Sequence, residues 1–489
     1  MVQRGLLSGK YQLISNVDAR RIHMASLEVL ESTGMHCPSE KIMKVFDDGG
    51  AEVSRSEKRV RIPQHLVDEA LKKVPHQVVF CGRDPANDIL LETGRVYYGM
   101  GGTPVPFIRD LETEEIRRPT KADMEEATTL GDALPNMKFL MSIAGVFDVP
   151  YEAEYLHEFE VLFNNTAKPI LYSAPGEYVS RRILEMASAI VGGQDQLAKR
   201  PILALYAETS SPLAFSAVNE NIIEFAKLGV PFVNGAGPMC GGTAPMTLAG
   251  AIVVGNSENL ATLTLAQLVR RHTPVVYSGW ACVMDPVTSR FAYGAPEFAM
   301  GANGLNAAMA RYYDLPCYGF GGCTDAKSPD AQAGAEVMMN CMIAGLSGVS
   351  LIHDCGYLAG GSVGSMEMAV IDNEVIGYVH RILRGVDVND DTLAVDIIKA
   401  VGPQGHFMSQ KHTLDNIRKE LYIPWLFDRT SEATWIRMGK KEIREVAREK
   451  AKKILREHSP KPLPSDVKQK IREILERSGQ TMREEACAA

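Results

Sequence analysis

Two groups of polar side chains lie only one predicted helix apart, between Leu315 and Ala359. The pattern there predicts strand, polar loop, helix, strand and polar loop. The first loop follows the apolar run 316–320 and carries Thr324, Asp325, Lys327, Asp330 and Gln332, and the second strand, 349–352, ends in His353, Asp354 and Cys355. Short apolar strands that end in glycine and polar groups are how an α/β barrel presents its chemistry. Helix N-capping is the alternative role for each Asp and Thr, and the sequence leaves it open.

His353 and Cys355 have the H-x-C spacing of a zinc–thiolate site. Zinc requires a third protein ligand, and the only cysteine further along the chain is Cys487, near the C-terminus. We therefore predict that the chain itself binds no metal ion. Other standard motifs fail as well: there is no P-loop and no GxSxG elbow, and GAGPMCGG has Cys240 where a dinucleotide fingerprint has its third glycine.

The elements that would position these groups are predicted from residue 96 onward. Strand segments are 96–100, 139–145, 169–173, 202–206, 231–234, 274–278, 316–320 and 349–353, and helical stretches include 152–164, 178–191, 219–228, 247–271 and 297–313. Strand–helix alternation repeated about eight times predicts an α/β fold of the (β/α)8 TIM-barrel type. A doubly wound open sheet is the alternative, and periodicity alone does not distinguish the two.

The ends of the chain have a different pattern from the predicted barrel at 96–385. Residues 1–95 are predicted to form an N-terminal cap of helices and a hairpin. Residues 386–489 are predicted to pack on or beside the barrel, and they end in two charged amphipathic helices parted by SPKPLP. The mixed polar and aromatic segment 405–429 suits packing across the barrel mouth, with a plain connecting helix as the alternative.

Composition narrows the class of protein. The 489 residues are 45% hydrophobic and 23% charged, as in an ordinary globular protein that could hold one large barrel with additions. The net charge of −8 disfavours nucleic acid as a partner, because phosphates are bound by basic faces. No apolar run of about 20 residues and no signal-peptide core occur, so we expect no membrane span. Nine scattered cysteines fit a reducing cytoplasm.

The predicted strand ends are rich in aromatic and carboxylate side chains and contain few basic ones. Aromatic faces near acidic groups suit a quaternary ammonium, which cannot donate ordinary hydrogen bonds and is bound by ring quadrupoles. Trp280 is the favoured cation-binding residue, because it follows a strand directly; core packing is the alternative for each aromatic. The predicted substrate-binding residues are Trp280, Tyr98, Tyr277, Phe320, Phe147, Tyr357, Asn234 and Gln332, and the candidate catalytic residues are His353, Asp325 and Glu208.

Three separated motifs resemble the trimethylamine methyltransferase (MttB-like) superfamily. They are GPMCGGTAPMTLAGAIVVGNSENLATLTLAQLV, TDAKSPDAQAGAE and FMSQKHTLDNIRKELYIPWLFDR, and the similarity extends from about Asp18 to Ile436. The resemblance implies a (β/α)8 enzyme that moves a methyl group from an amine to the Co(I) of a small corrinoid protein. The founding trimethylamine enzymes carry pyrrolysine, whereas this chain contains ordinary residues only. It therefore resembles the branch that demethylates quaternary amines.

The resemblance implies glycine betaine as the first candidate donor, with proline betaine, carnitine and γ-butyrobetaine as others. The donor carboxylate would be bound by the backbone at 101–103 or by His353. The cobalamin would be carried by a partner protein, with Gly237, Gly322, His412 and Gln404 as candidate contacts. We also expect a homo-oligomer. A zinc-dependent methyltransferase using His353 and Cys355, and a betaine-binding module without turnover, are the alternative functions.

Overall fold

Eight parallel strands form the centre of the protein, in a computed structural model that describes residues 2–488 and the side chains of residues 2–479. Their order in the sheet follows their order in the chain. They are β7 (Arg95–Met100), β10 (Met137–Leu140), β11 (Ile170–Ser173), β12 (Leu203–Glu208), β13 (Phe232–Gly235), β15 (Val275–Val276), β17 (Tyr318–Phe320) and β18 (Leu351–Cys355). β18 pairs with β7, so the last strand lies beside the first.

Main-chain hydrogen bonds close the sheet between β15 and β17. The N–H of Tyr277, just after β15, donates to the carbonyl of Pro316 at 2.9 Å, and the N–H of Tyr318 donates to the carbonyl of Tyr277 at 2.9 Å. A doubly wound sheet would have unpaired edges at this point. The (β/α)8 prediction is therefore confirmed, and the open-sheet alternative is wrong.

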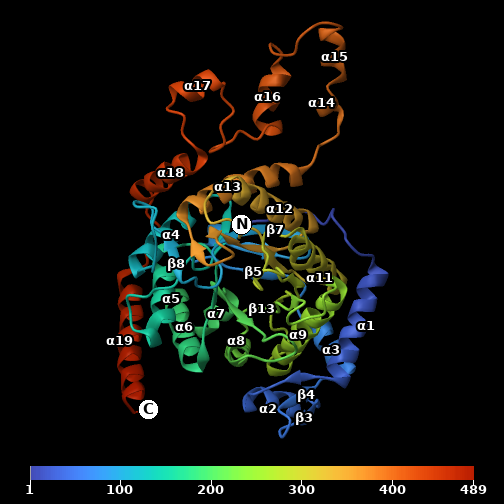
Figure 1. Cartoon of the computed structure of the whole chain (residues 1–489), viewed down its shortest axis with the longest axis vertical. Helices are drawn as coiled ribbons and strands as arrows, with labels where there is room; N and C mark the ends of the chain where they lie inside the picture. The colour runs from blue at the N-terminus through green and yellow to red at the C-terminus, as the bar shows by residue number, and fades with distance from the viewer. Residues whose placement is uncertain (1, 489) are drawn as a thin grey trace.

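A helix follows each strand and lies on the outside of the barrel (Figure 1). These helices are α4 (Lys121–Ala133), α5 (Glu154–Asn165), α6 (Gly176–Val191), α8 (Asn221–Leu228), α9 (Leu248–Val269), α11 (Asn306–Tyr313), α12 (Ala331–Ser347) and α13 (Met366–Arg384). Polar caps begin several of them; the side chains of Thr120, Asp330 and Ser365 accept backbone N–H groups at the starts of α4, α12 and α13. Asp330 therefore caps a helix, which is the alternative role that the sequence left open for it.

The N-terminal residues form helices and a small sheet. They comprise α1 (Asn16–Ser32), α2 (Glu40–Asp48), α3 (Gln64–Lys73) and the sheet of β2 (Met35–His36), β3 (Glu52–Ser54) and β4 (Arg59–Arg61). All three helices pack against α9. The N–H of Phe215 also donates to the carbonyl of His36 at 2.8 Å, which joins this unit to the loop after β12.

Residues 386–437 project away from the barrel beyond α13 (Figure 1). This extension holds α14 (Asp390–Leu393), α15 (Val395–Val401), α16 (Lys411–Glu420) and α17 (Glu432–Arg437), and none of these four helices contains a buried residue. It contacts the outer face of α13, where the main-chain N–H of Trp425 donates to Glu374 at 3.1 Å and Arg381 pairs with Glu420 at 3.1 Å. The predicted packing of 405–429 across the barrel mouth is therefore wrong, because its contacts are with an outer helix.

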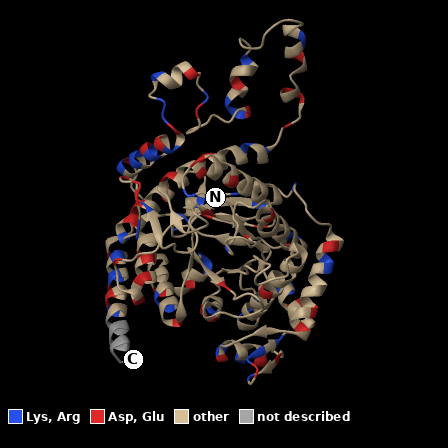
Figure 2. Ribbon diagram, viewed as in Figure 1, with Lys and Arg blue, Asp and Glu red and all other residues tan. Residues whose placement is uncertain are grey.

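The two C-terminal helices, α18 (Ile443–Glu457) and α19 (Ser465–Ala488), pack beside the barrel. α18 lies against α13 and α4, and α19 lies against α5 and α6. Charges of both signs are dense on these helices (Figure 2), and some of them are structural: Arg448 contacts Glu114 at 2.6 Å and Glu367 at 3.1 Å. Across the described residues, no helix is long and apolar enough to cross a membrane.

A buried acid in α5 makes stability depend on pH. Glu158 is buried, its Oε2 has no hydrogen-bond partner among the described residues, and burial raises its pKa from 4.5 to about 8. The raised pKa means that this group stabilises the fold below pH 4.5, and that the contribution is lost as pH rises through 8. The slope between these values is about 1.4 kcal/mol per pH unit.

We therefore expect Glu158→Gln to flatten the loss of stability between pH 5 and pH 9 and to raise stability at pH 9, since an amide stays neutral. Urea unfolding at several pH values measures both effects. The exposed Glu152→Gln, from the same segment, is the control and should unfold like the parent chain. Equal pH slopes for the parent and Glu158→Gln would contradict the assignment.

Candidate active site

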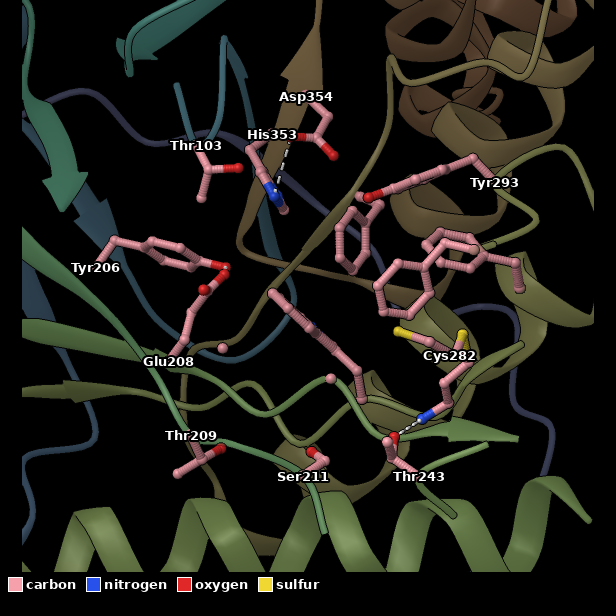
Figure 3. A pocket seen from close by; sticks show the side chains of 17 residues that line it. Thr103, Tyr206, Glu208, Thr209, Ser211, Thr243, Cys282, Tyr293, His353 and Asp354 are labelled. Carbon is pink, nitrogen blue, oxygen red and sulfur yellow. Dashed lines mark hydrogen bonds and ion pairs between the residues drawn. The ribbon is translucent and has the colours of Figure 1, made fainter. Parts of the chain in front are cut away.

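A cavity of about 390 Å³ lies at the C-terminal ends of the strands, where barrel enzymes carry their active sites (Figure 3). Its walls are supplied by strands β12, β13, β17 and β18, by the loops after β7, β12, β13 and β15, and by the end of α10 (Pro296–Phe298). It is lined by Thr103, Tyr206, Glu208, Thr209, Ser211, Gly235, Gly237, Met239, Thr243, Trp280, Cys282, Phe291, Tyr293, Phe298, Phe320, His353 and Asp354. No lysine or arginine is among these lining residues.

Aromatic side chains form one wall of the cavity. The Trp280 ring lies 4.4 Å from that of Phe320, and Phe298 and Tyr293 continue the wall, with their ring centres 4.9 Å apart. Trp280 is held in place because its Nε1–H donates to the carbonyl of Tyr318 at 2.8 Å. Gly235 and Gly237 face the indole and leave its surface open, since a Cβ at Gly235 would lie 3.1 Å from the ring.

Glu208 supplies a carboxylate on the opposite side of the cavity. The Tyr206 hydroxyl donates to its Oε1 at 2.5 Å, which leaves the second oxygen available to a ligand. The side chain is solvent-accessible through the cavity, yet protein atoms surround it on most sides, and this partial desolvation raises its pKa above 4.5. Glu208 is thus oriented for contact with a cation.

A second acid, Glu258 of α9, fixes the loop that follows Glu208. Its carboxylate accepts hydrogen bonds of 2.8 Å from the hydroxyls of Thr209 and Ser211 and from the main chain of Leu213. Glu258 is fully buried, and these three bonds satisfy it. It positions the cavity wall and does not itself line the cavity.

His353 is neutral, and its tautomer follows from its contacts. Its Nδ1 lies 2.7 Å from the carbonyl of Gly319, which can only accept, so Nδ1 carries the proton. Burial lowers the pKa of His353 to about 3, and Nε2 is therefore a bare acceptor, 3.2 Å from Oδ1 of Asp354. Burial raises the pKa of Asp354 well above its ordinary value, so its carboxyl loses its charge beside the neutral imidazole. His353 also stacks on Tyr318, with ring centres 4.0 Å apart.

The backbone at Asp354 separates His353 from Cys355. Asp354 has φ of +70°, and the pairing of β18 with β7 shifts register between Ile352 and Cys355. His353 faces the cavity, whereas Cys355 lies in the layer of helix α12 beside Cys341. The H-x-C pair therefore cannot share a metal ion. Cys487, the other candidate ligand, lies outside the residues whose side chains are described.

The cavity brings together part of the predicted site. Trp280, Phe320, His353, Glu208 and Gly237 all line it. Tyr357 lies directly behind Thr103, whose carbonyl accepts its hydroxyl at 2.8 Å. These residues come from separate strands, and only barrel closure makes them neighbours.

Other predicted residues lie elsewhere, and each has a structural contact that accounts for its position. Tyr98 and Tyr277 point outward to the helix layer, where their hydroxyls donate to Cys341 O and Asn256 Oδ1, both at 2.8 Å. Asn234 is buried against Asn219 at 3.1 Å, and Phe147 is exposed beneath the guanidinium of Arg118. Side chains alternate between the two faces of a strand, and both tyrosines fall on the face that points away from the cavity.

Asp325 and Gln332 also lie outside the cavity. Asp325 accepts the N–H of Gly294 at 2.8 Å and so fixes the loop that carries Tyr293. Gln332 is exposed on α12 and donates to Glu336 at 2.7 Å. Of the predicted corrinoid contacts, Gly322 is buried against Cys355, and His412 and Gln404 lie in the extension and are not among the residues that line the cavity.

Sequence reasoning missed four aromatic lining residues: Tyr206, Phe291, Tyr293 and Phe298. Tyr206 closes a predicted strand, and its spacing of two from Glu208 could have placed both on one face. Phe291 and Tyr293 belong to a hairpin and loop after β15, in which the N–H of Ala292 donates to Val283 O at 3.1 Å. No periodic pattern marks such a loop. Phe298 ends α10 (Pro296–Phe298), inside the helical stretch predicted at 297–313, and a helical pattern does not tell which of its residues face the cavity.

The closed barrel and the position of its cavity are those of a (β/α)8-barrel enzyme. The chain belongs to the trimethylamine methyltransferase (MTTB) family, whose sequence model matches residues 4–483. It is 35% identical to trimethylamine methyltransferase MttB of Desulfitobacterium hafniense DCB-2, over 94% of this chain and 93% of the relative. It is 30% identical to the glycine betaine methyltransferase of D. hafniense Y51, over 98% of this chain and 100% of the relative. The chain is thus a methyltransferase.

Among solved structures, the chain is similar to Methanosarcina barkeri monomethylamine methyltransferase MtmB. That structure is 12% identical in sequence, covers 92% of this chain and 95% of its own, and has a TM-score of 0.45. The resemblance to the MttB-like superfamily seen in the motifs is confirmed by the family match over the whole chain.

Trp280→Ala should weaken binding of a quaternary ammonium by more than about tenfold. A cation–π contact in a dry site is worth about 2 kcal/mol, and about 1.4 kcal/mol corresponds to one decade in Kd. Titration calorimetry with tetramethylammonium measures the change. Trp425→Ala is the matched control, because Trp425 contacts the Lys450 ammonium at 3.9 Å but lies outside the cavity. If folded Trp280→Ala binds tetramethylammonium with the same Kd as the parent protein, Trp280 is not part of the ligand site.

Proposed function

We propose that the protein transfers a methyl group from a quaternary amine to the Co(I) of a corrinoid carried by a separate protein, leaving a tertiary amine. The observation that carries this proposal is the small cavity with an aromatic wall, the oriented carboxylate of Glu208 and no lysine or arginine among its lining residues. Family membership and relatives named for trimethylamine and glycine betaine support it. Glycine betaine, proline betaine, carnitine and γ-butyrobetaine are the donors first suggested by the sequence.

The cavity suits the electrostatics of this reaction. A quaternary nitrogen carries a full positive charge and no N–H group, so ring faces and a nearby carboxylate are its best partners. When the methyl group leaves, the electron pair of the N–C bond stays on nitrogen and neutralises it. The leaving amine therefore needs no proton, which agrees with a cavity whose histidine is neutral and already hydrogen-bonded.

The residues would act mainly by holding the donor in one orientation and by excluding water from it. Trp280 and Phe320 bind the methyl groups, Glu208 balances the charge, and the neutral pair of His353 and Asp354 closes the far wall without adding charge. Such an arrangement aims one methyl group toward the opening of the cavity, and orientation of this kind is a large share of catalysis in displacement reactions.

The corrinoid is expected to stay outside the chain. A cavity of about 390 Å³ accommodates a small amine and leaves no room for a macrocycle in addition. When bound at the opening, reduced corrinoid supplies the nucleophile. The surface around the opening would then be the docking face, rather than the extension that carries His412 and Gln404.

Arg118 is the candidate centre of this docking face. Its guanidinium lies between two exposed rings, 5.0 Å from the centre of Phe107 and 4.7 Å from that of Phe147. These residues follow β7 and β10, so they lie on the barrel face onto which the cavity opens. Arginine beside exposed aromatics is a composition enriched at protein interfaces.

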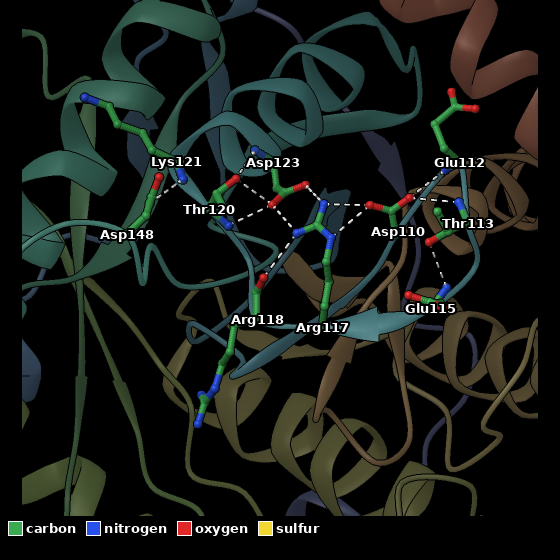
Figure 4. Close-up of polar contacts among 10 residues, drawn as sticks. All are labelled: Asp110, Glu112, Thr113, Glu115, Arg117, Arg118, Thr120, Lys121, Asp123 and Asp148. Atoms are coloured by element: carbon green, nitrogen blue, oxygen red, sulfur yellow. Dashed lines mark hydrogen bonds and ion pairs between the residues drawn. The ribbon is translucent and has the colours of Figure 1, made fainter.

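The neighbouring Arg117 makes this face rigid (Figure 4). It joins β9 (Ile116–Arg117) to α4, because its guanidinium contacts Asp110 and Asp123, each at 2.7 Å. Asp123 also accepts the N–H of Thr120 at 2.7 Å in the capping box of α4. A surface held this way loses little conformational entropy on binding.

A panel of donors tests the proposed reaction. The protein is incubated with Co(I) cobalamin and glycine betaine, proline betaine, carnitine, γ-butyrobetaine, choline, tetramethylammonium or trimethylamine, and methylation is followed by absorbance. We expect at least one quaternary amine to give multiple turnovers and trimethylamine to give none. Tight binding of an amine without methylation would instead support a binding module.

Arg118→Glu tests the docking face. We expect turnover with a corrinoid protein to fall at least about tenfold, since interface hot spots are worth about 2 kcal/mol or more. The rate with free cobalamin should stay unchanged, because Arg118 does not line the cavity. Arg429→Glu is the matched control: its guanidinium lies 5.6 Å from the Tyr378 ring, but in the extension. If only Arg429→Glu impaired the carrier reaction, the extension would be the docking site.

A further inference from the structure

The groups expected to bind a donor carboxylate are already engaged elsewhere. The N–H of Gly101 donates to Cys355 O at 2.9 Å, and the N–H of Gly102 donates to Ser142 O at 3.0 Å. His353 uses its Nδ1 proton on Gly319, and its Nε2, which carries no proton to donate, lies 3.2 Å from Asp354 Oδ1. The predicted carboxylate site at 101–103 and His353 is therefore not formed by Gly101, Gly102 or His353.

The charges of the side chains that line the cavity also argue against a binding site for a donor carboxylate. Glu208 is its exposed carboxylate, and no lysine or arginine is among the lining residues to balance a second negative charge. The hydroxyls of Thr209 and Ser211 donate to Glu258, and that of Tyr206 donates to Glu208. Thr103, Thr243 and Tyr293 add only neutral hydroxyls (Figure 3).

We infer that the preferred donor is a quaternary ammonium whose fourth substituent is uncharged, such as a hydroxyalkyl, alkyl or amide group, and that Glu208 sets this preference. The inference rests on the proposed function and narrows its substrate class. A single positive charge is balanced by Glu208. A betaine of similar size brings a carboxylate into the same small cavity. That carboxylate is repelled by Glu208, and no cationic side chain compensates for the loss of its hydration.

Matched ligands test the inference. Choline and glycine betaine amide resemble glycine betaine in size but lack its carboxylate, and calorimetry with the full-length protein gives the three Kd values. We expect both neutral-tailed cations to bind at least about tenfold more tightly than glycine betaine, which corresponds to about 1.4 kcal/mol. Equal or tighter binding of glycine betaine would overturn the inference.

Glu208→Gln tests the residue. The change keeps the shape and removes the charge, so choline should bind about tenfold more weakly while glycine betaine is unaffected or improved. This loss of selectivity is a readout that a merely structural role would not produce. Glu297→Gln is the control, because Glu297 is an exposed acid at the start of α10 (Pro296–Phe298), close to Phe298 in the chain but outside the lining. If Glu208→Gln keeps the same selectivity for choline over glycine betaine, Glu208 does not cause that selectivity.

The pH dependence of the parent protein provides a measurement without a variant. Only ionised Glu208 attracts a cation, and its pKa is raised by desolvation. Choline affinity should therefore increase with pH through a value above 4.5, with no step from His353 between pH 5 and 8; any second rise would come from Asp354, the other carboxyl that lines the cavity. A flat choline profile from pH 4.5 to 8 would contradict the role of Glu208.

These outcomes are independent of the proposed reaction. If glycine betaine is the best ligand and methylates cobalamin, the reaction stands and the charge preference fails. If choline binds best but no quaternary amine methylates cobalamin, the preference stands and the proposed transfer fails.

Discussion

The site depends on the left-handed backbone of Asp354. Two hydrogen bonds of 2.9 Å, from Asp354 N to Gly101 O and from Gly101 N to Cys355 O, hold this turn between β18 and β7. Gly102 provides the space, since a Cβ there would lie 2.2 Å from Asp354 Oδ1. A non-glycine residue with positive φ is uncommon, although Asp is among those that tolerate it. This turn directs the side chain of His353 into the cavity and that of Cys355 toward the helix layer. The two side chains therefore cannot bind one metal ion together, and His353 instead forms part of an uncharged cavity wall.

Burial then determines the charge of the cavity. The His353 imidazole and the Asp354 carboxyl are both buried, and burial disfavours the charged form of each. The negative charge that remains is that of Glu208, which has access to the cavity and is oriented by Tyr206. A site with one carboxylate and a wall of rings matches a cation better than a zwitterion, and its selectivity follows from this balance rather than from any titrating acid or base.

The extension at 386–437 contributes no residue to the lining of the cavity. Its exposed apolar side chains, such as Met408 and Leu414, gain little from the barrel, because the segment is attached mainly through α13. The face around Arg118 is different: it belongs to the barrel and is held by the ion pairs of Arg117. Rigid elements near the opening are therefore better placed to receive a partner than the extension is.

The sequence by itself determined the barrel, because eight apolar segments alternate with helices and local periodicity encodes both element types. It also placed Trp280, Phe320, His353 and Glu208 at strand ends, where polar and aromatic residues interrupt an apolar run. Only the tertiary structure decided which side chains face the cavity. Tyr98 and Tyr277 turn outward because of strand register, Phe291 and Tyr293 lie on an irregular loop, and Cys355 is turned away from the cavity by the positive φ of Asp354. Each of these depends on backbone geometry and long-range pairing, which residue type and spacing do not encode.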